Sequence, residues 1–167
     1  MFKFEDLFRK MGENFSVVWV LVAIINATVS ILVYDARVVA AFLGSLLFWC
    51  VGIQCISSCV LHWYRPTADK IAESIGWAPG SPFQKEVAAA AGAFGIMGIL
   101  CSWISGDFWT ATAIGASFMF FLMGIGHVLD IVRTKNISIY NAGSILYTDL
   151  LVPVVLIALL ILWKMGY

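Results

Sequence analysis

The sequence predicts an all-α, polytopic membrane protein: a transmembrane helix bundle of five spanning helices with shorter helices at the membrane surface. Of its 167 residues, 62% are hydrophobic and the mean hydropathy is +0.94, well above the values of a soluble domain. Only 12% are charged, and most of these lie outside apolar runs of about 20 residues, the length that crosses a bilayer. The runs lack the alternating pattern of a membrane β-barrel, so they are predicted to be helices.

The chain is expected to divide into a surface helix and one membrane domain. Residues 1–14 place phenylalanine, leucine and methionine at helical spacing opposite charged residues, which predicts an amphipathic helix lying on the membrane. Residues 15–167 form a single transmembrane helical domain in this interpretation. Its spans are expected at about 15–34, 38–63, 86–105, 108–131 and 144–163.

The connections between spans are of two kinds. Short turns that contain Asp35 and Asp107 predict antiparallel hairpins, with each aspartate capping the helix that follows. The connection 64–85 is longer and is expected to lie at the membrane interface. Within it, Thr67 can cap a short helix and Gly76 can end that helix.

The third span has a strong start signal and a surface of small residues. Ser81 and Gln84 have the spacing of a capping box, which would bring Glu86 into the first turn. The segment "AAAAGAFGIMG" that follows gives small residues four apart, a pattern that lets helices approach closely. We expect this surface to pack against the fourth span, with a dimer interface as the alternative.

The basic residues predict the orientation in the membrane. Eight of the ten lie in the N-terminal segment, the connection between spans two and three, and the connection between spans four and five. These segments share one side, which the positive-inside rule assigns to the cytoplasm. The N-terminus is therefore predicted to be cytoplasmic and the C-terminus to lie outside.

Several polar residues fall at the cytoplasmic end of this topology. His127 and Asp130 share one face of the fourth span, and Asp149 lies more than one turn inside the fifth. The candidate ion- or proton-binding residues are Glu86, His127, Asp130, Asn141 and Asp149.

Carboxylates with one imidazole suit either a proton relay or a divalent metal ion, for which the predicted ligands are Glu86, His127, Asp130 and Asp149. The alternative for Glu86 and Asp130 is helix capping and pairing with nearby basic residues.

A second, softer metal site is conceivable on the second span. Cys55, Cys59 and His62 share one helix face and could bind copper(I) or zinc. The alternative is that the cysteines act as small hydrophobic residues. The only two histidines, His62 and His127, could in principle ligate haem, but nothing else in the sequence indicates a porphyrin pocket, so haem is not expected.

Three segments carry a resemblance to known proteins: "SPFQKEVAAAAGAFGIMGIL", "GIGHVLDIV" and "NAGSILYTDLLVPVVL". In these the chain resembles a family of small, functionally uncharacterised bacterial and archaeal integral membrane proteins. Its motifs are Ser-Pro-Phe-Gln-x-Glu, Gly-His-x-x-Asp, Asn-x-Gly and Asp-x-x-x-Pro, and the resemblance covers about the C-terminal half. It implies a prokaryotic inner membrane and no particular activity. It also implies that the five candidate residues belong together.

These patterns favour a transporter or channel subunit that moves a cation or protons through the cytoplasmic-side pocket. Because the chain is only 18.4 kDa, we expect a homo-oligomer or a larger membrane complex. One alternative is an accessory or assembly subunit of such a complex, and another is an intramembrane metal-dependent enzyme. The sequence assigns no catalytic residue. Equal numbers of acidic and basic residues give no reason to expect nucleic acid as a partner, whereas the lipid bilayer is expected as one.

Overall fold

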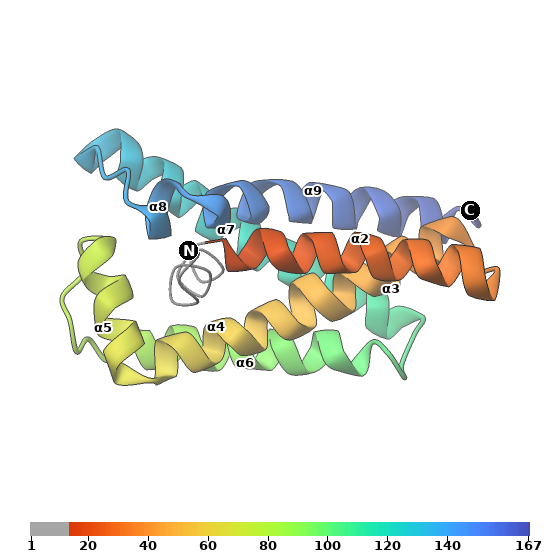
Figure 1. Cartoon of the computed structure of the whole chain (residues 1–167), viewed down its shortest axis with the longest axis horizontal. Coiled ribbons are helices and arrows are strands. Elements are labelled where there is room, and N and C mark those ends of the chain that lie inside the picture. The colour runs from red at the N-terminus through yellow and green to blue at the C-terminus, as the bar shows by residue number, and fades with distance from the viewer. Residues whose placement is uncertain (1–13) are drawn as a thin grey trace, which may run out of the picture.

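The computed structural model describes residues 14–167, which form helices and contain no strand. The predicted surface helix at 1–14 lies almost entirely outside the described residues. The elements in chain order are α2 (Phe15–Tyr34), α3 (Val38–Leu46), the π-helical segment η1 (Leu47–Ile53), α4 (Gln54–Trp63), α5 (Arg65–Ser74), α6 (Phe83–Leu100), α7 (Asp107–Thr134), α8 (Ile139–Ala142) and α9 (Ser144–Lys164). Figure 1 shows the long helices lying side by side, with α5 and α8 at one end of the bundle and the C-terminus at the other.

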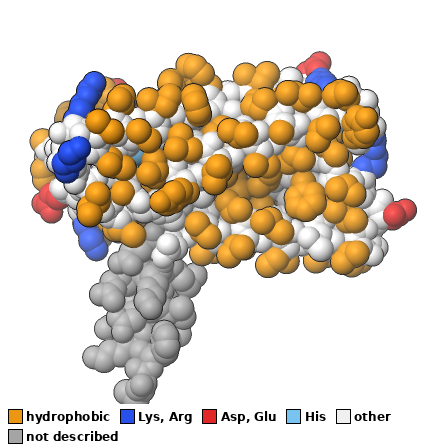
Figure 2. Space-filling view, turned by 90° about the horizontal axis from the view of Figure 1, so that it is seen from above, with side chains coloured by type: hydrophobic (Ala, Val, Ile, Leu, Met, Phe, Trp, Pro, Cys, Tyr) orange, Lys and Arg blue, Asp and Glu red, His pale blue; other side chains and the backbone are white. Residues whose placement is uncertain are grey.

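Four helices are long and apolar enough to cross a membrane: Phe15–Tyr34, Val38–Trp63, Asp107–Thr134 and Ile139–Lys164. Large apolar side chains are exposed along them, and Figure 2 shows hydrophobic side chains over the middle of the bundle with charged ones at its two ends. Exposed apolar surface of this extent indicates a lipid bilayer environment. The all-α class is therefore confirmed.

The third of the five expected spans, at 86–105, is the one on which the structure differs. Its helix, α6, runs over Phe83–Leu100 and is not among the four long apolar helices. The polar residues Gln84, Lys85 and Glu86 occupy its first turn and lower its apolar character.

The helix Val38–Trp63 crosses the bundle obliquely and joins its two sides (Figure 1). Its first part, α3, packs against α2 and α9, whereas η1 and α4 pack against α6. The π-helical segment lies between these two sets of contacts. A π-helical turn changes the direction in which side chains project, which lets one helix serve two partners.

Glycines bring α6 into backbone contact with this crossing helix. A Cβ atom on Gly95 would lie 2.8 Å from the backbone nitrogen of Ile56, and one on Gly98 would collide with the backbone of Gly52. The small residues of α6 therefore serve tight packing, as predicted, but the expected partner was wrong. The partner is the second span, because the glycines recur on the face that meets η1 and α4.

The helix ends also differ from the expected caps. Asp35 ends α2 in the left-handed backbone conformation, with φ of 53°, instead of capping the next helix. Asp107 is the first residue of α7, and its carboxylate pairs with Lys164 Nζ at 3.2 Å. The short helix expected after Thr67 begins earlier, at Arg65.

We expect Gly98→Ala to lower the free energy of unfolding by about 1 to 3 kcal/mol, because the added methyl group must displace backbone atoms. Gly126→Ala is the matched control, since no atom lies within 4 Å of a Cβ added to this exposed glycine of α7. That variant should be unchanged or more stable by about 0.5 to 1 kcal/mol. Thermal unfolding followed by circular dichroism in detergent measures both. Equal effects in the two variants would contradict the packing described.

Candidate functional site

The buried carboxyl group of Asp149 faces an imidazole between α7 and α9. Asp149 Oδ2 lies 3.8 Å from His127 Nε2, and the two side chains are 1% and 17% exposed. The helices approach closely here because Gly124 has no side chain: a Cβ atom there would lie 2.7 Å from Leu150 Cδ2. The 3.8 Å separation is within reach of an ion pair but too long for a hydrogen bond.

Asn141, which is 1% exposed, fixes the orientation of this imidazole. Its Nδ2 donates hydrogen bonds of 2.7 Å to Asp130 Oδ2 and to the carbonyl oxygen of Asn136. With the amide nitrogen so engaged, Asn141 Oδ1 faces His127 Nδ1 at 2.8 Å and can only accept. His127 Nδ1 therefore carries a hydrogen, and Nε2 is the nitrogen that can gain or lose a proton.

Asp130 forms the outer end of the network. Its side chain is half-buried near the end of α7, and Thr134 Oγ1 donates to its backbone carbonyl at 2.9 Å. The carboxylate acts on the imidazole through Asn141 and does not contact it directly. Asp130, Asn141 and His127 thus form a chain that leads from the end of the bundle to the buried Asp149.

Asp149 has few partners in the part of the chain that the structure describes. Its Oδ2 has no hydrogen-bond partner there, although His127 faces it. Cys55, which is 2% exposed, lies within electrostatic reach of it. Proline at position 153 has no N–H, so the Asp149 carbonyl lacks its usual partner within the helix. The buried carboxyl group is therefore open to a further interaction.

The structure brings together four of the five residues that the sequence singled out. Glu86 is the exception. It is exposed in the first turn of α6 and has no hydrogen bond or ion pair with any of residues 14–167. Because α6 packs against η1 and α4, Glu86 lies apart from the network of α7, α8 and α9.

The softer cysteine and histidine set is arranged differently from a metal site. His62 Nδ1 lies 2.5 Å from Gln84 Oε1, and Gln84 Nε2 donates to the carbonyl oxygen of Ala68 at 3.1 Å. Cys55 is buried, and Cys59 packs against α6 at Gly92. Within residues 14–167 no group of three or more histidine, cysteine, aspartate or glutamate residues could hold a metal ion. Both metal sites stay predictions.

Two amide side chains are the functional residues whose roles sequence reasoning missed. Gln84 was assigned to a capping box and Asn141 was counted only as an ion- or proton-binding candidate, yet each is buried and its amide oxygen faces a histidine nitrogen. Both amides follow a short helix or loop after the span that carries the histidine. A polar amide about 14 to 22 residues beyond each histidine, next to a span, was the available signal.

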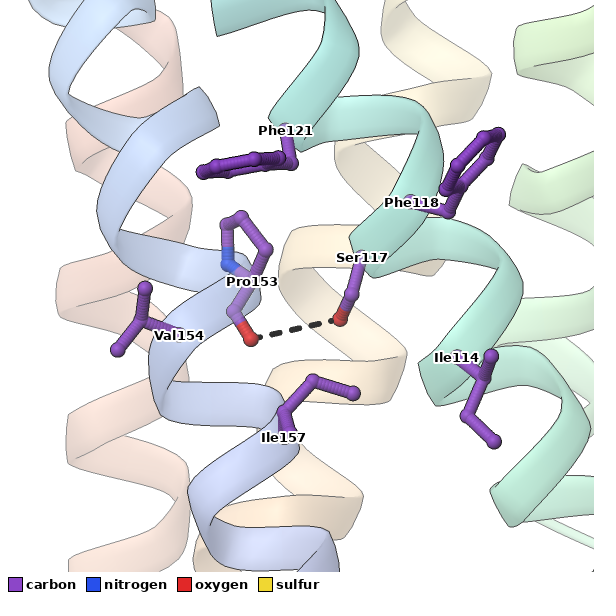
Figure 3. Close-up of a pocket in the computed structure, with 7 residues that line it drawn as sticks. All are labelled: Ile114, Ser117, Phe118, Phe121, Pro153, Val154 and Ile157. Atoms are coloured by element: carbon purple, nitrogen blue, oxygen red, sulfur yellow. Dashed lines mark hydrogen bonds between the residues drawn. The ribbon is translucent and has the colours of Figure 1, made fainter.

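An apolar groove of about 410 Å³ lies beside the site, between α7 and α9. Figure 3 shows Ser117 pointing toward the carbonyl oxygen of Pro153, to which its hydroxyl donates at 3.5 Å. The remaining lining comes from apolar side chains such as Phe121, Val154 and Ile157. The groove offers contact surface and no titratable group.

A family model described as "Family of unknown function (DUF6790)" matches residues 13–166. The chain belongs to this family. The match covers most of the chain, more than the C-terminal half that carried the resemblance. No curated protein and no solved structure matches the chain.

We expect nitrogen NMR of ¹⁵N-histidine-labelled protein in detergent to find neutral His127 protonated at Nδ1, because Asn141 Oδ1 can only accept a hydrogen bond. Asn141→Leu should remove this preference. His62→Gln is used to assign the two sets of resonances. A neutral His127 protonated at Nε2 in the wild type would contradict the arrangement.

Proposed function

We propose that this membrane protein takes up and transfers protons at the His127–Asp149 pair, as a transporter or channel subunit. The observation that carries the proposal is a buried carboxyl group 3.8 Å from the one imidazole nitrogen that is free to exchange a proton. Ionisable groups are costly inside a membrane, and by default they mark ion or proton pathways. A proton that reaches Nε2 from the bundle end can pass to Asp149 Oδ2 once the two atoms approach from 3.8 Å to hydrogen-bond distance, and Asp149 then holds it inside the bundle.

Asn141 and Asp130 have a supporting role in this proposal. An imidazolium formed by protonation of Nε2 is stabilised by the Nδ1–H bond to Asn141 Oδ1, and Asn141 is in turn polarised by the Asp130 carboxylate. The same two residues prevent the ring from rotating. Nε2 therefore stays directed toward Asp149 in both protonation states.

The topology and orientation of the chain in the membrane are part of the same proposal. Residues 15–167 act as one transmembrane domain of five spans, with α6 as the third. The bundle end with α5 and α8 faces the cytoplasm of a prokaryotic cell. Support comes from the eight-to-two distribution of basic residues. A homo-oligomer or a larger membrane complex would complete the path beyond Asp149.

Hydrogen bonds within the site favour protons over a divalent metal. Asn141 already occupies His127 Nδ1 and Asp130 Oδ2, which leaves His127 Nε2 and the Asp149 carboxylate as converging ligands. A stable metal site ordinarily uses more protein ligands than two residues supply. A divalent metal site would require Glu86 or another ligand to move next to His127 and Asp149.

We expect Asp149→Asn to reduce proton flux into liposomes, followed with an enclosed pH-sensitive dye under an imposed membrane potential, to the rate of protein-free vesicles. The amide cannot exchange a proton with His127. Glu86→Gln makes the same chemical change on an exposed residue outside the network and should keep the wild-type rate. Both variants must first elute as single species after reconstitution.

Two other outcomes of this experiment would favour different functions. Wild-type flux in Asp149→Asn would sink the proton pathway. Absence of flux in the wild type, together with lower yield of a larger complex in Asp149→Asn, would favour the accessory or assembly role.

We expect elemental mass spectrometry of the protein purified in mild detergent to find no metal in stoichiometric amount, because too few ligand atoms converge on Asp149. Asp149→Asn prepared in parallel is the control. Stoichiometric metal in the wild type that is lost in the variant would overturn the preference for protons. It would reopen the metal-dependent transport and enzyme alternatives.

A further inference from the structure

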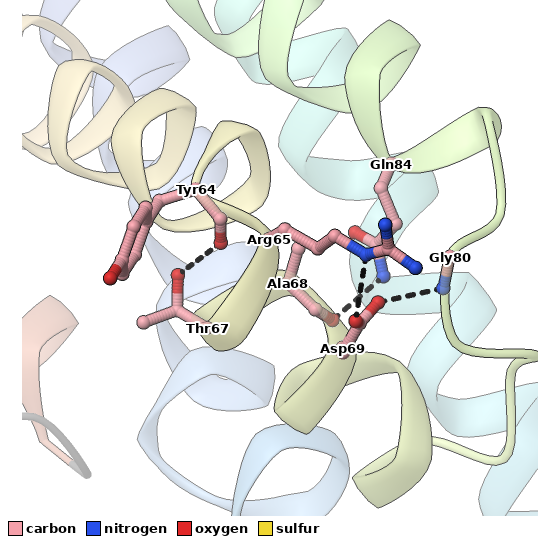
Figure 4. Close-up of polar contacts among 7 residues, drawn as sticks. All are labelled: Tyr64, Arg65, Thr67, Ala68, Asp69, Gly80 and Gln84. Atoms are coloured by element: carbon pink, nitrogen blue, oxygen red, sulfur yellow. Dashed lines mark hydrogen bonds and ion pairs between the residues drawn. The ribbon is translucent and has the colours of Figure 1, made fainter.

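A second pocket, separate from the His127–Asp149 site, lies where α4, α5 and α6 meet at one end of the bundle. Its volume is about 200 Å³, and its lining includes Trp63, Arg65, Asp69 and Lys85. Two of these residues are cationic and one is anionic, so the lining carries one net positive charge. Figure 4 shows Arg65 extending beside Asp69 toward the loop that contains Gly80.

The anionic residue of the pocket is already engaged by the protein. Asp69 Oδ1 accepts the N–H of Gly80 at 2.7 Å, and Asp69 Oδ2 lies 3.4 Å from Arg65 Nε. Asp69 thus contacts the guanidinium through Nε alone. Among the described residues its two terminal nitrogens donate no hydrogen bond, and the side chain is 83% exposed. A guanidinium presented in this way can bind a phosphate through two parallel hydrogen bonds.

The inner wall of the pocket is rigid. Gln84 is 3% exposed and is held from two directions, by His62 Nδ1 at its amide oxygen and by the Ala68 carbonyl at its amide nitrogen. Lys85 projects from the next position, with its Nζ 5.6 Å from the centre of the Trp63 ring. The cations are thus arranged around a preformed wall, which reduces the entropy lost on binding a ligand.

Aromatic side chains in the segment that includes α5 are typical of the level of the lipid headgroups, and one of them, Trp63, lines the pocket. Trp63, Tyr64 and Trp77 are 59%, 61% and 45% exposed, and all three lie in the segment that surrounds α5. Tryptophan and tyrosine concentrate at the boundary between hydrocarbon and water. Phe83 does not line the pocket, but it precedes the lining residue Gln84 at the start of α6 and is 63% exposed, so it offers apolar surface to an acyl chain.

We propose that this pocket binds the phosphate of an anionic phospholipid, with Arg65 and Lys85 as the phosphate ligands and Trp63 and Phe83 beside the acyl chains. Basic pockets between helices on the cytoplasmic side of membrane proteins bind anionic headgroups in this way. A soluble phosphate would use the same two cations but would gain nothing from Trp63 and Phe83. An anionic phospholipid is therefore the ligand that uses both the two cations and the apolar residues beside them.

Native mass spectrometry of the full chain released from detergent tests the site, with phosphatidylglycerol as the probe and phosphatidylcholine for comparison. We expect wild-type protein to retain phosphatidylglycerol preferentially. The double variant Arg65→Gln/Lys85→Gln should bind it about thirtyfold more weakly, because each basic residue near an anionic lipid contributes roughly a factor of five. Arg133→Gln/Lys135→Gln removes equal charge from exposed positions at the same end of the bundle and should bind as the wild type does.

The single variant Lys85→Gln guards against misfolding, since Lys85 makes no hydrogen bond that holds the α5 region in place. It should bind about fivefold more weakly while unfolding at the wild-type temperature. Equal losses in the double variant and in the Arg133→Gln/Lys135→Gln control would overturn the proposal and indicate general surface charge. Displacement of phosphatidylglycerol by millimolar inorganic phosphate would also overturn it, in favour of a soluble phosphate ligand.

Discussion

The structure depends on one constraint: hydrocarbon offers no hydrogen-bond partner, so a polar group within the bundle is costly unless it finds a partner in the chain itself. The backbone satisfies this by forming helices over nearly all of residues 14–167. The two histidines satisfy it in the same way as each other. Each presents Nδ1 to the side-chain amide oxygen of a buried residue, Gln84 for His62 and Asn141 for His127, and each amide nitrogen donates to a backbone carbonyl.

The two histidine–amide pairs differ in what faces the second ring nitrogen. At His127, that nitrogen is 3.8 Å from the carboxyl group of Asp149, and the amide also contacts Asp130. At His62 no carboxyl group among residues 14–167 makes such a contact, and the histidine forms part of the wall of the α4–α5–α6 pocket. The same device therefore serves two purposes. In one place it holds the ring that we propose exchanges protons, and in the other it forms the wall of a pocket that we propose binds lipid.

Helix packing explains why the candidate site formed without Glu86. Gly95 and Gly98 let α6 approach the crossing helix until backbone atoms meet, and α8 is not among the helices against which α6 packs. On the other side, Gly124 lets α9 approach α7, which brings Asp149 within reach of His127. Glycine at a few positions thus decides which helices approach closely and which polar groups meet. Their own charges do not decide it.

Local sequence patterns were enough to predict the membrane class, the limits of the first two apolar helices, the position of Asp149 more than one turn inside its helix, and the shared helix face of His127 and Asp130. These follow from hydropathy and from the 3.6-residue period, which act within one helix. Only the tertiary structure decided that Asn141 stands between His127 and Asp130, that Gln84 turns inward, and that α6 packs on η1 and α4. Small residues permit close approach to any neighbour, and a short amide can cap, face solvent or bridge two side chains. The choice among these depends on which helices meet, and a local pattern does not contain that information.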